Sequence, residues 1–211
     1  MATVEHSLLT GASLHEPKGV DAATASTVYV ADGIGSGAWT ALTTFNPFGN
    51  QLFHVRDQVS SGTASQGNLT DATWNTRRLQ TTITNEITSA SLASNQLSLP
   101  EGTYFVQGWA LHYYAPAAAV SASLTGKLRL RNITGSTTLL LGSQFNTSSF
   151  QSSDAYNVTY KLEIHGRFTL VGTTTIELQH WNDHTNTTGN AGLAASSGEN
   201  EIYSELLIWK V

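Results

Sequence analysis

The sequence predicts an all-β protein, an antiparallel two-sheet sandwich or jelly roll of about ten strands behind an extended N-terminal arm. Three observations predict this fold. Apolar and polar residues alternate with period two in several segments, clusters of Gly, Pro, Asn and Ser separate these segments, and no segment keeps a helical period. The chain of 211 residues is long enough for one such sandwich and an arm.

Residues 1–50 are expected to form the arm, and residues 51–211 the sandwich. The arm is rich in Gly, Ala, Ser and Thr and contains several turn signals. Only residues 27–30 and 38–42 have strand character, and both segments are short. Because the arm cannot bury much apolar surface by itself, we expect it either to gain order on another surface or to remain partly disordered.

The strands of the sandwich are predicted from alternation. Residues 156–170 give the clearest pattern, in which Leu162 and Ile164 alternate with Lys161 and Glu163, so that one face lies in the core and one in water. The same pattern recurs at residues 124–132 and 174–181. Further strands are predicted at residues 52–58, 79–84, 92–99, 103–114, 138–145 and 203–211.

Two of these predicted strands, 103–114 and 203–211, are apolar on both faces. Such strands must be covered on both faces, whereas a two-layer sandwich covers only one face of each sheet. We expect a partner subunit to supply the second cover; the alternative is that the N-terminal arm folds back over it. The residues expected at a trimer interface are Tyr104, Trp109, His112, Tyr114, Tyr203, Leu207 and Trp209.

Composition and charge restrict the function. The net charge of −5 argues against nucleic acid as a partner, which requires a basic surface. The absence of cysteine excludes disulfides and thiolate metal sites. No apolar run has the length of a membrane span and the N-terminus does not resemble a secretory signal, so we expect no membrane partner.

The chemistry-bearing residues do not form a catalytic pattern. The sequence contains no nucleophile elbow, phosphate loop or zinc motif, and its acids are spread without local pairing, so we expect neither enzyme activity nor a cofactor. His180 and His184 have metal-ligand spacing for a helix, but here that spacing spans a strand end and a loop, so we expect no metal. The oxygen-rich loop at residues 182–190 fits turn chemistry better than calcium binding.

One segment resembles a known jelly-roll signature. Residues 99–106 (Leu-Pro-Glu-Gly-Thr-Tyr-Phe-Val) resemble the strand-opening motif of the complement-type globular head, in the tumour-necrosis-factor-like jelly-roll superfamily. Residues 203–209 (Tyr-Ser-Glu-Leu-Leu-Ile-Trp) look like the last strand of the same fold. The resemblance covers residues 51–211, and it implies ten strands, two five-stranded sheets and a compact trimer packed around aromatic residues of the inner sheet.

The arm carries a second resemblance. Residues 15–20 (His-Glu-Pro-Lys-Gly-Val) and 28–33 (Val-Tyr-Val-Ala-Asp-Gly), a Gly/Ser run and Trp39-Thr40 look like the N-terminal segment of phage head-decoration and head-fibre proteins. This implies that the arm docks on the major capsid protein while the jelly roll projects outward. Extended segments can bind through main-chain hydrogen bonds, with aromatic residues as anchors. The expected capsid-binding residues are Leu14, His15, Glu16, Pro17, Val28, Tyr29, Trp39 and Phe48.

Together, the two resemblances imply a structural virion protein, a homotrimeric capsid decoration (cement) or head-fibre protein made in the host cytoplasm and located on the capsid surface. The alternative is a receptor-binding fibre or spike tip that recognises host-surface glycans. Its ligand loop would contain Trp181, Asp183 and His184, since an indole can stack on a sugar ring. The two functions are compatible, because a capsid fibre can also contact the host.

Overall fold

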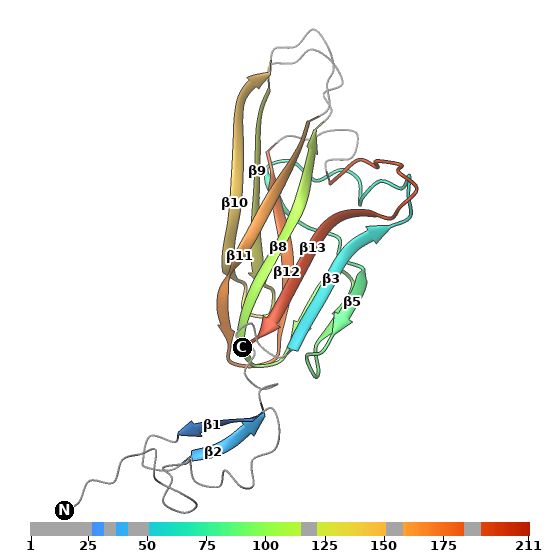
Figure 1. The fold of residues 1–211 in the computed structure, drawn as a ribbon. Coiled ribbons are helices and arrows are strands. Elements are labelled where there is room, and N and C mark those ends of the chain that lie inside the picture. Colours follow the sequence, from blue (N-terminus) through green and yellow to red (C-terminus); the bar gives the residue numbers. More distant parts are fainter. Residues whose placement is uncertain (1–26, 32–36, 42–50, 115–121, 151–157, 184–190) are drawn as a thin grey trace, which may run out of the picture. The chain divides into compact units, whose positions relative to one another are not determined.

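The chain is all β throughout its described part (Figure 1). A computed structural model describes residues 27–31, 37–41, 51–114, 122–150, 158–183 and 191–211, with the backbone alone at 114, 122–124, 147–150 and 158. Every strand pairing in these residues is antiparallel, which confirms the predicted fold class. These residues form no helix, and thus none suited to crossing a bilayer.

The chain divides into two compact units, Met1–Pro47 and Phe48–Val211. In the first unit, β1 (Thr27–Ala31) and β2 (Gly37–Ala41) form an antiparallel hairpin. Its register places Tyr29 opposite Trp39, and their ring centroids lie 5.5 Å apart at an interplanar angle of 66°. The two short strand segments expected in the arm are therefore partners of each other.

The second unit contains two sheets. The first, called here the β8 sheet, has the order β11-β8-β13-β3-β5. Its strands are β3 (Gln51–Val59), β5 (Thr81–Asn85), β8 (Gly102–Tyr114), β11 (Val158–Leu170) and β13 (Glu201–Lys210).

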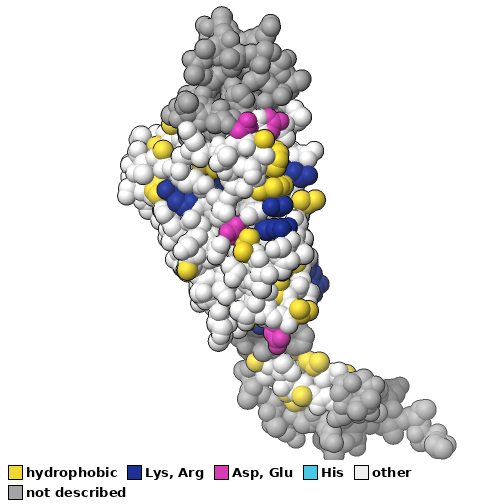
Figure 2. Space-filling view, turned by 180° about the vertical axis from the view of Figure 1, so that it is seen from behind, with side chains coloured by type: hydrophobic (Ala, Val, Ile, Leu, Met, Phe, Trp, Pro, Cys, Tyr) yellow, Lys and Arg dark blue, Asp and Glu magenta, His cyan; other side chains and the backbone are white. Residues whose placement is uncertain are grey.

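The second sheet, called here the β9 sheet, has the order β10-β9-β12-β7-β6, and β4 also pairs with β12. Its strands are β4 (Thr73–Thr76), β6 (Ser91–Ala93), β7 (Gln96–Leu99), β9 (Ala122–Asn132), β10 (Thr137–Phe150) and β12 (Thr174–Asn182). Figure 2 shows the protein from the side opposite to that of Figure 1, and on this side Lys and Arg side chains gather beside hydrophobic ones.

Most connections between the long strands pass from one sheet to the other, apart from the β9–β10 hairpin. The connections β8 to β9, β10 to β11, β11 to β12 and β12 to β13 each change sheet, so strands distant in sequence become neighbours. The last strand, β13, thus pairs with β3 on one side and β8 on the other. This interleaved order is that of a jelly roll, and it explains why alternation recurs along the whole unit.

Two local features differ from the sequence prediction. The single strand predicted at residues 92–99 is a hairpin of β6 and β7, because Ser94 and Asn95 both adopt positive φ, 51° and 66°. Two consecutive residues of this kind form the tight turn that matches the twist of paired strands. Strand β4 was not predicted, since its four residues include one large apolar side chain, Trp74.

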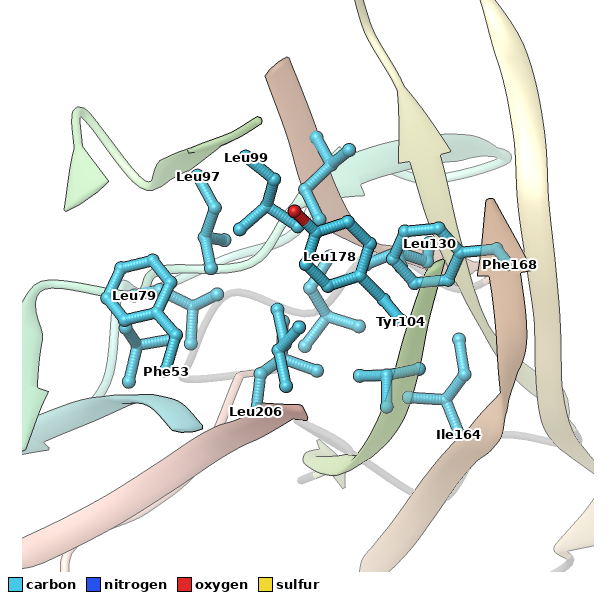
Figure 3. Packing of buried hydrophobic residues seen from close by; sticks show 14 of the residues in the cluster. Phe53, Leu79, Leu97, Leu99, Tyr104, Leu130, Ile164, Phe168, Leu178 and Leu206 are labelled. Atoms are coloured by element: carbon cyan, nitrogen blue, oxygen red, sulfur yellow. The ribbon is translucent and has the colours of Figure 1, made fainter. Parts of the chain in front are cut away.

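The core lies between the sheets (Figure 3). On β11 the buried side chains include Leu162, Ile164 and Phe168, which confirms the face predicted from alternation. Phe168 stacks on Tyr104 of β8 with ring centroids 5.5 Å apart, and the Tyr104 hydroxyl donates to the carbonyl of Pro100 at 2.7 Å. Leucines of β7, β9 and β12 complete the opposite side: Leu97, Leu99, Leu128, Leu130 and Leu178.

Candidate functional site

The outward face of the β8 sheet carries a group of large apolar side chains. Phe105, Trp109 and Leu111 of β8 alternate with the core residues of that strand, and Leu207 and Trp209 of β13 do the same; all five are half-buried in the single chain. Phe105 and Trp209 are paired across the strands, with ring centroids 5.9 Å apart. This outward apolar group belongs to the two strands, 103–114 and 203–211, for which we expect a partner subunit to cover the second face.

The carboxylate of Glu205 lies within this apolar group. Glu205 of β13 accepts hydrogen bonds from His54 Nε2 at 2.7 Å, Arg56 Nε at 2.6 Å and Trp109 Nε1 at 2.8 Å. Burial opposes ionisation of Glu205, but the hydrogen bonds from Arg56, His54 and Trp109 outweigh it and lower the pKa of this carboxyl. The charge is thus compensated inside the face, so the face is suited to burial against another protein surface.

A groove between β8 and β11 borders the apolar group. It has a volume of about 280 Å³ and is lined in part by Phe105, Trp109, Lys161 and His165. Lys161 Nζ lies 5.5 Å from the Trp109 ring centroid and 3.0 Å from a carboxylate oxygen of Glu163. The groove is open and mixed in polarity, so it can receive a side chain of a partner at the edge of the apolar face.

Some of the predicted trimer-interface residues lie on the outward face, and others are buried inside the sandwich. Trp109, Leu207 and Trp209 lie together on the outward face. Tyr104 and His112 point into the sandwich and are 0% and 1% exposed, which corrects their assignment to an interface. Both faces of β8 are apolar, so the sequence pattern could not show which face the β9 sheet covers.

Tyr203 is also buried within the single chain. It lies at an irregularity in the pairing of β13 with β3, between Ile202 and Ser204, and its hydroxyl donates to the carbonyl of Thr63 at 2.8 Å. At 1% exposure it has no surface for a partner, which corrects a second assignment. Tyr114 pairs with Val158 through its backbone, and its side chain lies outside the described residues.

Glu205, His54 and Arg56 belong to this face but were not predicted from the sequence. The available signal was Glu205 itself, a lone acid within the apolar segment at residues 203–209. An acid in such a segment requires donors nearby, but the alignment of β3 beside β13, which supplies two of them, arises only in the folded sheet.

The structure describes one of the two histidines considered as a metal pair. His180 is fully buried and its Nε2 lies 2.8 Å from Nδ1 of His112, while His184 lies outside the described residues. Burial, and then the nearby Arg77 guanidinium, lower the pKa of His112 to about 4. Among the described residues, no group of three or more His, Cys, Asp or Glu side chains could hold a metal ion.

The residues proposed for a ligand loop lie at the end of β12. Trp181 is half-buried on the outward face of the β9 sheet, and its indole lies 5.8 Å from that of Trp74 between ring centroids. The backbone N–H of Asp183 donates to the carbonyl of Thr125 at 3.2 Å. The remainder of that loop, including His184, is outside the described residues.

Part of the predicted capsid-binding set lies in the β1–β2 hairpin. Tyr29 and Trp39 form the ring contact described above, and Val28 pairs with Thr40. The other predicted residues are outside the described part of the chain: Leu14, His15, Glu16, Pro17 and Phe48.

Comparison with known proteins gives similarity of structure alone. No protein-family model matches the sequence. No curated protein matches it. The chain is similar to murine APRIL in crystal structures at pH 8.0 (TM-score 0.43) and pH 5.0 (TM-score 0.42), with 12% sequence identity and coverage of 76% of this chain and 98% of that chain in each case.

Proposed function

We propose that this protein is a non-enzymatic homotrimer that decorates the surface of a phage capsid, binding it through residues 1–50 and displaying the jelly roll. The observation that carries the proposal is the outward apolar group of the β8 sheet, formed by Phe105, Trp109, Leu111, Leu207 and Trp209. The proposal places three copies of this face around one axis. Its mechanism is adhesion and bracing of the capsid, without turnover.

The composition of the face supports burial between subunits. Trp, Phe and Arg are enriched at protein interfaces, whereas charged residues are depleted from the interface centre. Here the face carries two indoles and one phenyl ring together with the Glu205 carboxylate, which already has three donors. A partner can therefore cover the face without leaving an unpaired charge.

The oligomeric state tests the first part of the proposal. Size-exclusion chromatography with light scattering should give three times the chain mass of 22.6 kDa for the native protein. Leu207→Asp should give folded monomers, because it places an unpaired charge in the apolar group. The control is Leu141→Asp, at a position on β10 that is 61% exposed, and it should remain trimeric. A native monomer, or a trimer that survives Leu207→Asp, would contradict the proposal.

The arm is proposed to hold the capsid. The resemblance of residues 15–20 and 28–40 to phage decoration proteins supports this role, as does the Tyr29–Trp39 pair, since aromatic side chains are frequent anchors at interfaces. Three arms on one trimer would also bind the capsid with avidity.

Capsid binding tests the second part. The native trimer should sediment with empty capsids of the phage that encodes it, whereas the double variant Tyr29→Ala and Trp39→Ala should remain in the supernatant as an intact trimer. The control is Thr40→Ala in the same hairpin, which should sediment as the native protein does. Sedimentation of the double variant at native levels would show that the hairpin does not hold the capsid.

A further inference from the structure

The outward face of the β9 sheet combines basic and aromatic side chains. Lys127, Arg129 and Arg131 alternate along β9 with the core residues of that strand, so all three point outward. Neighbouring side chains on β9 are about 7 Å apart along one face. Figure 2 shows basic side chains gathered on this side of the molecule, in a protein whose net charge is −5. The local charge is thus opposite in sign to that of the whole chain.

Two indoles lie beside this basic row. The register of β9, β12 and β4 places Trp181 opposite Lys127 on one side and Trp74 on the other. Trp74 and Trp181 meet edge to face at 65°, and both remain partly exposed. The guanidinium carbon of Arg129 lies 4.1 Å from the Trp74 ring centroid. Aromatic rings and cations therefore share one platform.

Hydrogen bonds hold this platform in place. Arg129 Nε donates to the Gln179 side-chain oxygen at 2.8 Å, and Gln179 Nε2 donates to Glu177 at 2.7 Å. Glu177 also accepts hydrogen bonds from Gln96 and Thr76, and it is 7% exposed. Because the Arg129 side chain is already fixed, ligand binding there costs less of the side-chain entropy of Arg129.

The cations of the row form no direct ion pair within the described part of the chain, although the charge of Glu177 acts on Arg129. Among the described residues, the ion pairs involve neither Lys127, Arg129 nor Arg131. Glu177 lies opposite Arg131 in the register, but its carboxylate oxygens are occupied by the neutral donors described above. The row can therefore bind an anion without first breaking an ion pair of its own.

We propose that the outward face of β4, β12 and β9 binds an acidic polysaccharide. Lys127, Arg129 and Arg131 pair with successive anionic groups of the sugar chain, and the indoles of Trp74 and Trp181 contact sugar rings. Alternate side chains of one strand form a linear row, which matches a linear polymer better than a compact ligand. Aromatic rings offer an apolar surface to the C–H groups of a sugar, and the cations provide the selection for acidic chains.

An acidic polysaccharide fits this face better than a nucleic acid or a second copy of the chain. Nucleic-acid binding requires a positive field over a wide surface, and here the row is narrow on a protein of negative net charge. A second copy would need a large apolar area, and the large apolar group lies on the other sheet. The inference does not depend on trimer formation or capsid attachment.

Isothermal titration calorimetry of the full chain tests the proposal with three probes of similar length: oligogalacturonate, neutral dextran and a single-stranded DNA. Oligogalacturonate should bind, more weakly as salt increases, and dextran should bind at least about tenfold more weakly. Failure to bind oligogalacturonate, equal binding of dextran, or tighter binding of DNA would each overturn the proposal.

Variants then locate the site. The double variant Lys127→Gln and Arg131→Gln, and separately Trp74→Ala, should each weaken oligogalacturonate binding by about tenfold or more. The matched control removes two cations from the β8 sheet, Arg167→Gln with Lys210→Gln, and should bind within about twofold of native. Circular dichroism and light scattering verify that each variant keeps its fold and assembly. Native affinity in both site variants would overturn the placement of the ligand.

Discussion

The Nδ1 atom of His112 lies 2.8 Å from the Nε2 atom of His180, so a buried hydrogen bond between two imidazoles joins the β8 sheet to the β9 sheet. Arg77, which is fully buried, stands nearby and donates to the carbonyl oxygens of Ala191 at 2.8 Å and Tyr203 at 3.2 Å. Burial lowers the pKa of Arg77 to about 10, and burial, followed by the charge of this guanidinium, lowers the pKa of each imidazole. The histidine pair is therefore held neutral in the folded protein.

Acidification should destabilise the fold through this pair. The pKa of His112 is lowered to about 4 and that of His180 is lowered well below its ordinary value, in each case mainly by burial. As the pH falls below about 6.5 the unfolded chain binds protons that the folded chain does not, so stability decreases between about pH 6.5 and pH 4. The loss from His112 should be on the order of 3 kcal/mol below pH 4.

Urea denaturation between pH 8 and pH 4 measures this dependence. His112→Gln keeps a donor and an acceptor but cannot titrate, so its unfolding free energy should vary less with pH than that of the native protein. His165→Gln removes an exposed histidine and should leave the native pH dependence unchanged. Equal pH dependence in native protein and His112→Gln would refute the role assigned to the pair.

Removal of Asp57 should strongly destabilise the fold. Its carboxylate is 0% exposed, accepts from Arg78 Nε at 2.7 Å, and accepts from the Ser65 hydroxyl at 2.7 Å. Asp57→Ala leaves Arg78 without its partner and should cost about 3–5 kcal/mol in urea denaturation. Glu163→Ala breaks an exposed pair with Lys161 and should cost less than about 1 kcal/mol. Similar costs for the two variants would argue against the buried pair as a structural element.

Gly108 should not tolerate a side chain. A Cβ atom there would lie 2.4 Å from Leu206 Cδ2 and 2.5 Å from the carbonyl oxygen of Glu205, in the centre of the β8 sheet. Gly108→Ala should therefore lower the midpoint of thermal unfolding and cost about 1–3 kcal/mol. Gly172, where a Cβ would meet nothing within 4 Å, provides the control, and its alanine variant should remain near native stability. Native stability of Gly108→Ala would show that the strands can separate there.

The indole of Trp109 should help to keep Glu205 ionised. Trp109→Phe keeps an aromatic ring but removes the N–H that donates to Glu205 at 2.8 Å, so the pKa of this carboxyl should rise. Carbon-13 NMR of the glutamate carboxyl groups across the acid range measures the change. Trp209→Phe alters the same face without removing that donor and should leave the Glu205 pKa near its native position. An unchanged Glu205 pKa in Trp109→Phe would show that the indole does not help to keep this carboxyl ionised.

Much of the fold follows from local patterns in the sequence. Alternation in residues 156–170 was enough to place Leu162, Ile164 and Phe168 in the core, because successive side chains of a strand point to opposite faces. The type of turn between β6 and β7 was not predicted, since Ser94 and Asn95 lack the glycine that usually marks it.

The candidate surfaces were only partly predictable. Trp109, Leu207, Trp209 and Trp181 were identified from apolar runs and from aromatic character. Trp74, Glu205 and two of its donors, His54 and Arg56, were missed, because their neighbours belong to strands far away in the chain. Which strands become neighbours depends on the strand order of the sheet, and a short stretch of sequence does not reveal that order.

The sequence by itself determined that the described part of residues 51–211 is built mainly from strands, and it determined which side chains of β11 face the core. Only the tertiary structure decided the two faces of β8, where Tyr104 and His112 lie inside and Trp109 lies outside. The physical reason is that both faces of β8 are apolar, so the residue pattern does not distinguish the core face from the outward face. The β9 sheet covers one of them, and the face that it leaves open is the one proposed to bind a partner.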